Sequence, residues 1–296
     1  MLLPLSRCFP LLLLLPLLPA TTACTTDNSR GAFANVNKEY EVAEIGKLNK
    51  RAQESSGLEI AGPSGDLWTH ADGGNTARLY RVTRQGDLLQ SLDLEPLQNI
   101  DWEDLTQDDE HRLYVGDFGN NKNKRRNLRI YRLSGPTLQQ VDTIEFSYPD
   151  QRKFPPRKPH RNFDCEAFYY FQDSLYLYTK NRGEGQYVKQ YVLPARPGRY
   201  VARLADSLQL PTWVTAADIS PDGQRVALLG AGYVYQFERL PNRRLFDGLK
   251  SQLRLPKSGQ AEAVVYTTNQ DLVFSNEKGK LFEARHKVAP QAAGTP

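Results

Sequence analysis

Cysteine is scarce in this chain of 296 residues, which contains only Cys8, Cys24 and Cys165. The first two lie in or beside an apolar N-terminal segment, so only Cys165 belongs to the body of the fold and no disulfide can form within it. Side-chain packing, alone or together with a bound metal ion, must therefore hold the fold. We predict that Cys165 is a buried structural thiol, because its acidic neighbours disfavour a thiolate and no histidine is near in sequence.

Two catalytic signatures and a strong charge bias are also absent. The chain has no Gly-x-Ser-x-Gly and no His-Glu-x-x-His segment, which disfavours a serine hydrolase and a zinc protease. The net formal charge is only +4. The aromatic residues fall mainly at predicted strand positions rather than among the basic residues, so nucleic-acid binding is not favoured.

Long apolar runs are confined to the N-terminus. Residues 1–23 combine Arg7, an apolar stretch and a small-residue end, which is typical of an export signal and too short for a spanning helix. Ala23-Cys24 matches the junction of a bacterial lipoprotein, although Thr21 replaces the usual bulky apolar residue. We expect an exported protein, either lipidated at Cys24 (periplasmic or on the outer membrane) or simply secreted. Residues 24–37 are predicted as a tether, 38–288 as the folded domain and 289–296 as a disordered tail.

Short, mostly acidic segments recur at the start of apolar strands. They are centred on Ser56, Glu103, Glu166, Ala217 and Glu262, with spacings of 47, 63, 51 and 45 residues. Each is followed by several short strands, rich in aromatic and β-branched residues, with turn residues between them. A period of this length is typical of propeller blades. The sequence therefore predicts an all-β fold, a single β-propeller.

The number of blades follows from a missing strand. The last unit, residues 263–284, holds only three predicted strands, whereas residues 40–48 form a predicted strand with no partner nearby. Placing this N-terminal strand on the outside of the last blade closes the ring and removes both open edges. Five blades are therefore favoured over six.

The acidic repeats predict a metal site. The innermost strands of a propeller surround one axis, so their carboxylates converge and either take up protons or bind a cation. Oxygen ligands of this kind suit Ca²⁺ before Mg²⁺. The predicted ligands are Ser56, Glu103, Glu166, Asp218 and Glu262. The alternative is that each acid caps its own blade.

A ligand-binding mouth is predicted on the face where the chain enters the inner strands. The loops between the second and third strands open on this face and supply the candidate ligand-binding residues Asp72, Asp117, Asn120, Asn121, Lys180, Asn181 and Arg182. Two basic clusters, 122–126 and the proline-rich insertion 152–161, are predicted to rim the mouth, which would suit an anionic ligand. The alternative is ordinary turn chemistry in solvated loops.

Four motifs carry a family resemblance: Asp101–Leu105, Trp68–Gly74, Gly116–Asn121 and Ala217–Gly223. Together they resemble a family of exported bacterial β-propeller proteins, most of them uncharacterised. More distantly, the chain is similar to the calcium-activated nucleotidases (apyrases), five-bladed propellers with one oxygen ligand per blade around an axial Ca²⁺. That likeness implies Ser56, Glu103, Glu166 and Glu262 as ligands. Ala217 departs from the pattern and leaves Asp218 or a backbone carbonyl, and no nucleotide-contacting set is matched.

Two function classes remain open. The first, which we prefer because a fold does not define an activity, is a monomeric binding or scaffolding propeller with an axial Ca²⁺ and an anionic small molecule, glycan or protein as partner. Its only membrane contact would be an N-terminal lipid. The second is a metal-dependent hydrolase of phosphate esters, nucleotides or lactones. Its cation would activate water, Asp101 or Asp164 would be the base and His70 the acid.

Overall fold

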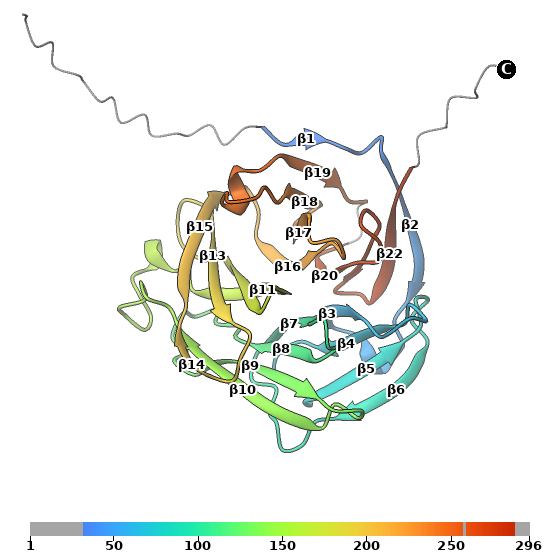
Figure 1. The fold of residues 1–296 in the computed structure, drawn as a ribbon, viewed down its shortest axis with the longest axis horizontal. Coiled ribbons are helices and arrows are strands. Elements are labelled where there is room, and N and C mark those ends of the chain that lie inside the picture. Colours follow the sequence, from blue (N-terminus) through green and yellow to red (C-terminus); the bar gives the residue numbers. More distant parts are fainter. Residues whose placement is uncertain (1–31, 257–258, 288–296) are drawn as a thin grey trace, which may run out of the picture. The chain divides into compact units, whose positions relative to one another are not determined.

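The computed structural model describes residues 32–256 and 259–287 and shows a five-bladed β-propeller (Figure 1). The predicted fold is confirmed. The export signal, Cys24 and the C-terminal tail predicted from the sequence lie outside the described residues. Within the described part, no helix is long and apolar enough to cross a membrane.

Each blade is an antiparallel sheet whose first strand lies innermost. Blade one contains β3 (Ser55–Ile60), β4 (Leu67–Ala71), β5 (Arg78–Val82) and β6 (Leu88–Asp93). Blade two contains β7 (Trp102–Gln107), β8 (Leu113–Asp117), β9 (Leu128–Ser134) and β10 (Gln140–Ser147). Blade three contains β11 (Asp164–Phe171), β12 (Ser174–Lys180), β13 (Tyr187–Pro194) and β15 (Arg203–Gln209).

Blade four contains β16 (Val214–Ile219), β17 (Arg225–Gly230), β18 (Tyr233–Glu238) and β19 (Lys250–Arg254). Blade five contains β20 (Ala261–Tyr266), β21 (Leu272–Asn276), β22 (Lys280–His286) and, on the outside, β2 (Tyr40–Lys47). In the part of the chain that the structure describes, three short 3-10 helices lie in connections: η1 (Lys50–Ala52), η2 (Lys158–His160) and η3 (Leu245–Asp247).

The ring closes as the sequence predicts. Strand β2 pairs antiparallel with β22 from Tyr40–His286 to Lys47–Lys280, so the N-terminal strand completes the last blade. The closure is fixed to blade one, because the backbone N–H of Lys47 donates to the carbonyl of Gln85 at 2.9 Å. Gly46 lies against this same carbonyl and has no room for a side chain.

Two further strands extend the sheets beyond the expected four. Strand β1 (Ala34–Asn35) pairs in parallel with β19, and Phe33 packs edge-on against Tyr235 and Phe237 with ring centroids 5.1 and 5.7 Å apart. Residues 33–37, expected within the tether, therefore pack on blade four. Strand β14 (Gly198–Val201) pairs in parallel with β10 of blade two. Residues 200–210, expected as one strand of blade three, therefore serve two blades, and both additions cover an otherwise open sheet edge.

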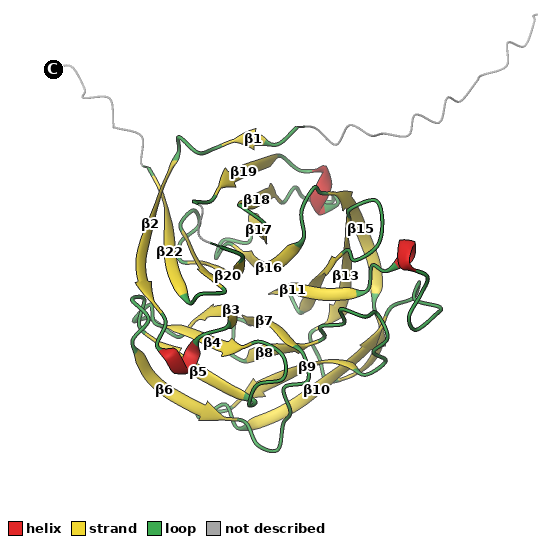
Figure 2. Cartoon of the chain, turned by 180° about the vertical axis from the view of Figure 1, so that it is seen from behind, coloured by secondary structure: helices red, strands yellow, loops and turns green. Residues whose placement is uncertain are grey.

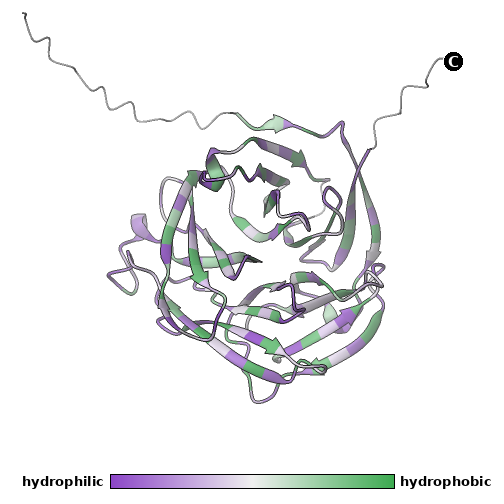
Figure 3. Cartoon of the chain, viewed as in Figure 1, coloured by the Kyte–Doolittle hydropathy of each residue, from purple (hydrophilic) through white to green (hydrophobic). Residues whose placement is uncertain are grey.

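The hydrophobic core is divided among the interfaces between blades. Five clusters of buried side chains each combine residues from two neighbouring blades, such as Tyr114 and Phe118 of blade two with Phe168 and Tyr191 of blade three. Apolar and polar residues alternate along the strands, for example along β10 (Figure 3), so each sheet presents apolar side chains to its neighbour. Cys165 is free and fully buried within one cluster, as a structural thiol would be.

Candidate functional site

A β-bulge occurs at the same place in every inner strand. The strand register shifts between Ser55 and Gly57, Trp102 and Leu105, Cys165 and Ala167, Val214 and Ala216, and Ala261 and Ala263. The acidic repeats seen in the sequence coincide with these bulges. A bulge leaves one residue unpaired and re-aims its side chain, and bulges are common beside functional sites.

Structural equivalence corrects the predicted ligand of blade four. The bulges contain Ser56, Glu103, Glu166, Thr215 and Glu262, so Thr215 takes the place expected for Asp218. Asp218 lies further along β16, where its carboxylate accepts the backbone N–H of Tyr266 at 2.6 Å. It is therefore a link between blades four and five and not part of the mouth.

Below the bulges, buried carboxylates join the inner strands to one another. Asp104 is fully buried and accepts backbone N–H groups from Leu105 at 2.9 Å, Phe168 at 3.0 Å and Ala217 at 3.2 Å. Glu59 accepts the backbone N–H of Gln107 at 3.0 Å. Together with Asp218, this inner layer satisfies backbone donors in all five blades. Of the repeated acids for which the sequence left capping open as an alternative, only Asp218 belongs to this layer, and it caps a strand of the neighbouring blade.

Asp72, Asp101 and Glu103 form the group of acids best suited to a cation. One ligand atom from each lies within 4.8 Å of the others. Glu103 is only 6% exposed, and within the described structure its carboxylate makes no hydrogen bond or ion pair. Asp101 sits between two glycines, because a Cβ on Gly73 would lie 2.5 Å from its Oδ1 and a Cβ on Gly119 would lie 2.7 Å from its Oδ2. Side chains larger than glycine at these positions would fill the space around the carboxylates.

Burial and repulsion from neighbouring acids disfavour the charged forms of Asp101, Glu103 and Glu262. For each of these carboxyl groups, burial is the largest cause of the rise in pKa. It raises the pKa of Asp101 to about 6 despite the opposing guanidinium of Arg125, and it raises the pKa of Glu103 well above its ordinary value, with Glu166, Asp72 and Asp101 adding to the shift. Burial also raises the pKa of Glu262 to about 7. A cation among these groups would relieve both effects.

On the other side of the mouth, two basic side chains of blade three form ion pairs with the acids. Lys180 Nζ lies 2.8 Å from Glu166 Oε2. Arg182 bridges Asp164 and Glu166, with nitrogen–oxygen distances of 2.6 and 2.9 Å. Asp164 and Glu166 are therefore neutralised within the protein. This geometry does not favour Glu166 as a metal ligand or Asp164 as a free base.

His70 does not reach the mouth. Its side chain is fully buried, its Nδ1 lies 3.0 Å from the carbonyl oxygen of Ala71, and its ring packs edge-on against Trp102 at 5.5 Å. Burial lowers its pKa, so the neutral ring is favoured. The acid role expected for His70 is therefore not supported, since the ring is a core element between blades one and two.

The predicted ligand-binding residues divide into two groups. Asp117, Asn120 and Asn181 hold the loops: Asp117 Oδ1 accepts from Arg125 at 2.8 Å, the backbone N–H of Asn120 donates to Asp164 at 2.6 Å, and Asn181 Oδ1 accepts the backbone N–H of Gly183 at 2.7 Å. The others stand at the mouth itself: Asp72, Lys180, Arg182 and Asn121, whose side-chain oxygen accepts from Arg182.

Trp213 is a mouth residue that sequence reasoning missed. Its side chain is 51% exposed, and the cationic groups of Arg182 and Lys180 lie 5.2 and 5.9 Å from the centre of its ring. An indole at this position offers a flat apolar surface beside two cations. The sequence did offer one indication of an exposed position, because Trp213 lies in the short segment before β16 and not within a strand.

The insertion 152–161 does not rim the mouth. Figures 1 and 2 show η2 and its flanking loop outside the ring, beside β13 and β15. In the other basic cluster, Arg125 turns inward to Asp117, and Arg126 stacks on Phe154 of the insertion with its guanidinium 3.8 Å from the ring centre. Only part of the predicted basic rim is therefore present.

Comparisons with known proteins define the fold and no more. No family model and no curated protein matches the sequence. Among solved structures, the chain is similar to the PQQ-bound aldose sugar dehydrogenase from Streptomyces coelicolor, with 11% identity over 84% of this chain and 98% of that one and a TM-score of 0.51. It is also similar to a gluconolactonase from Xanthomonas campestris, with 13% identity over 85% of this chain and 91% of that one and a TM-score of 0.50.

Proposed function

We propose that this protein is a ligand-binding propeller whose mouth holds a divalent cation, with Ca²⁺ favoured, through Asp72, Asp101 and Glu103. The observation that carries the proposal is the carboxylate of Glu103, which is buried, has no partner in the described structure and faces two other acids. An unpaired buried carboxylate is costly unless it is protonated or bound to a cation.

The separation of the three acids fits calcium. Calcium–oxygen bonds of about 2.3–2.6 Å allow two ligand oxygens of one ion to lie up to about 5 Å apart, and these three groups lie within 4.8 Å of one another. The proposed set is displaced toward blades one and two and replaces the five-ligand ring expected from the sequence. Of the five expected ligands, Glu166 is ion-paired with Lys180 and Arg182, and Asp218 is hydrogen-bonded to the backbone of Tyr266 in blade five.

An anionic ligand suits the other side of the mouth. Lys180 and Arg182 are fixed in place by their acidic partners, so they offer oriented donors with little loss of side-chain entropy. Trp213 beside them can pack against a ring. A bound cation and these two side chains would together attract a carboxylate or phosphate attached to a ring-shaped body. Export is part of the proposal and is supported by the sequence of residues 1–23, with lipidation at Cys24 as the alternative to simple secretion.

Hydrolysis of a lactone or phosphate ester is the second candidate. The gluconolactonase shows that this kind of fold can carry lactone chemistry. Here Asp101 would act as the base beside a cation held by Asp72 and Glu103. A bound cation would supply electrophilic stabilisation of the substrate oxygen. With His70 buried in the core, the described mouth supplies no histidine acid.

Calorimetric titration tests the proposal. The wild-type protein, treated with a chelator and then freed of it, is titrated with CaCl₂, and we expect one binding event. Glu103→Gln should weaken it about 100-fold, whereas Glu41→Gln, at an exposed glutamate on β2, should leave it unchanged. No binding by the wild type, or equal binding by Glu103→Gln, overturns the cation site.

Substrate screening separates the two functions. Lactones, phosphate monoesters and nucleotides are offered with and without Ca²⁺. Turnover that disappears in Asp101→Asn supports the hydrolase, while binding without turnover supports the binding propeller.

A further inference from the structure

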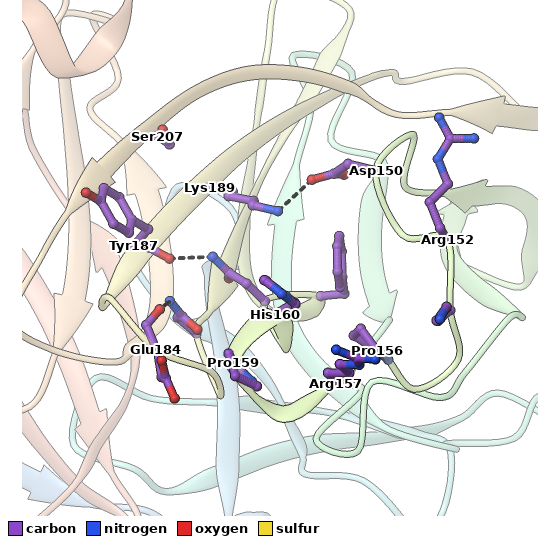
Figure 4. A pocket seen from close by; sticks show the side chains of 14 residues that line it. Asp150, Arg152, Pro156, Arg157, Pro159, His160, Glu184, Tyr187, Lys189 and Ser207 are labelled. Carbon is purple, nitrogen blue, oxygen red and sulfur yellow. Dashed lines mark hydrogen bonds and ion pairs between the residues drawn. The ribbon is translucent and has the colours of Figure 1, made fainter. Parts of the chain in front are cut away.

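A second concave site lies at the periphery of blade three, away from the mouth. It is a hollow of about 620 Å³ lined by the insertion that follows β10, by the β12–β13 loop and by β13 and β15 (Figure 4). This volume falls within the range of small-molecule sites, about 300–1,000 Å³. Neither the cation site nor Trp213 contributes to it.

The loops that form this pocket are fixed against one another. The backbone N–H of Arg182 donates to the carbonyl of Arg161 at 2.8 Å, and that of Glu184 donates to the carbonyl of Pro159 at 3.1 Å. The Asn162 side chain donates to the carbonyl of Tyr187 at 2.7 Å. Such cross-links between the insertion and blade three pre-organise the pocket, which lowers the entropic cost of binding.

The pocket carries a surplus of positive charge. Four cations line it (Arg152, Lys153, Arg157 and Lys189) against two carboxylates (Asp150 and Glu184), a surplus of two positive charges. Lys189 is neutralised by Asp150 at 2.5 Å. The side chains of Arg152, Lys153 and Arg157 are exposed and form no ion pair within the described structure. Figure 4 shows Arg152 and Arg157 on the side opposite Glu184 and Tyr187.

The remaining polar groups limit the kind of ligand. The amides of Asn162 and Asn181 are already hydrogen-bonded within the protein. Among the described lining residues, the donors without a hydrogen bond are the three cations of the insertion, the ring of His160 and the hydroxyl of Tyr187. Glu184 offers acceptors on the far side. Tyr187, which is 44% exposed, provides an aromatic surface on the same side as Glu184, with Pro156 and Pro159 as further apolar lining.

We propose that this pocket binds a phosphorylated sugar. Its phosphate lies against Arg152, Lys153 and Arg157, because guanidinium groups bind phosphate through paired charge-assisted hydrogen bonds. The sugar ring lies on Tyr187 and the prolines, and its hydroxyls donate to Glu184. This polarity matches a ligand with an anionic end and a hydroxyl-bearing end, and it distinguishes the site from a merely basic surface.

Calorimetry with three probes tests the site: glucose 6-phosphate, inorganic phosphate and glucose, each in buffer with chelator so that the mouth holds no cation. We expect the sugar phosphate to bind more tightly than inorganic phosphate and glucose not to bind measurably. The double variant Arg152→Gln/Arg157→Gln should weaken the sugar phosphate at least tenfold. Its matched control is Lys38→Gln/Arg254→Gln, which removes the same charge from exposed positions beside β1 and on β19 and should have no effect.

A third variant tests the orientation. Glu184→Ala should weaken glucose 6-phosphate and leave inorganic phosphate unchanged, a pattern that loss of folding cannot produce. Three results would each overturn the proposal: no binding of glucose 6-phosphate, equal losses in the double variant and its control, or binding that disappears in Glu103→Gln, which would place the anion at the mouth.

Discussion

Replacing Glu103 with glutamine is the sharpest test of the cation site, because it should have opposite effects with and without calcium. In the absence of calcium, the wild-type carboxylate is buried among Asp72, Asp101 and Glu166 without a partner. Glutamine is nearly isosteric and removes that repulsion, so the variant should be more stable than the wild type in chelator. With calcium present, the variant lacks one of three anionic ligands and should gain much less from the ion.

The expected size follows from the spacing of the acids. At an effective dielectric constant of about 20, unit charges 4.8 Å apart interact by about 3 kcal/mol. If removing one of the three anionic ligands costs an energy of this size, the affinity for the cation falls about 100-fold, since tenfold is 1.4 kcal/mol. Calcium at about 100 times the wild-type Kd stabilises the wild type by about 2.7 kcal/mol and the variant by about 0.4 kcal/mol. These values correspond to increases in Tm of about 5–11 °C and about 1–2 °C.

The assay is thermal unfolding of both proteins in chelator and in a calcium series, with Glu41→Gln as the control. We expect the variant to melt about 2–4 °C above the wild type in chelator, for a gain of about 1 kcal/mol, because protonation of Glu103 already relieves most of the repulsion. The cation site would be refuted by a wild-type Tm that does not change with calcium, or by a calcium-induced increase in Tm that is equal in the variant and the wild type. A variant that melts lower in both conditions would show that Glu103 has a structural role instead.

Two further predictions concern the inner layer of carboxylates. Burial raises the pKa of Glu59 to about 8 and that of Asp218 to about 7, so between pH 4 and these values the folded state binds more protons than the unfolded state, and the free energy of unfolding falls as pH rises. In chelator, Tm should therefore decrease from pH 5.5 to pH 8 and decrease less in Asp218→Asn; a Tm that rises over this range would contradict the assignment. Asp104→Ala should cost about 3–6 kcal/mol in urea unfolding, because three buried N–H groups lose their acceptor, whereas Asp104→Asn keeps an acceptor oxygen and should cost clearly less; equal losses would show that the hydrogen bonds are not the cause.

The residues at the mouth were predicted only in part from the sequence. The spacing of the acidic repeats located Glu103, Glu166 and Glu262 correctly on the inner strands of blades two, three and five, because each blade repeats one pattern. It misplaced the fourth member, since the bulge selects Thr215 and leaves Asp218 to cap a neighbouring blade. Thr215 and Asp218 lie three positions apart on β16, and no local feature of the sequence reports which residue the bulge selects.

The sequence also did not predict the ion pairs and hydrogen bonds between residues that are far apart in the chain. Asp164 and Glu166 occupy the same positions in their repeat as Asp101 and Glu103 do in blade two. They are nevertheless neutralised by Lys180, the last residue of β12, and by Arg182 just after it. The insertion 152–161 was identified as basic and stiff, but its direction depends on backbone hydrogen bonds to the β12–β13 loop. Those contacts place it outside the ring, where it forms the peripheral pocket.

The sequence by itself determined the all-β class, the five blades and the closure by residues 40–47, because strand periodicity, turn residues and an unpartnered strand are local signals that repeat around a ring. Only the tertiary structure decided which carboxylates remain unpaired. Whether a buried acid is capped, paired with a cation or left free depends on groups contributed by other blades, and their distances exist only after the ring has closed.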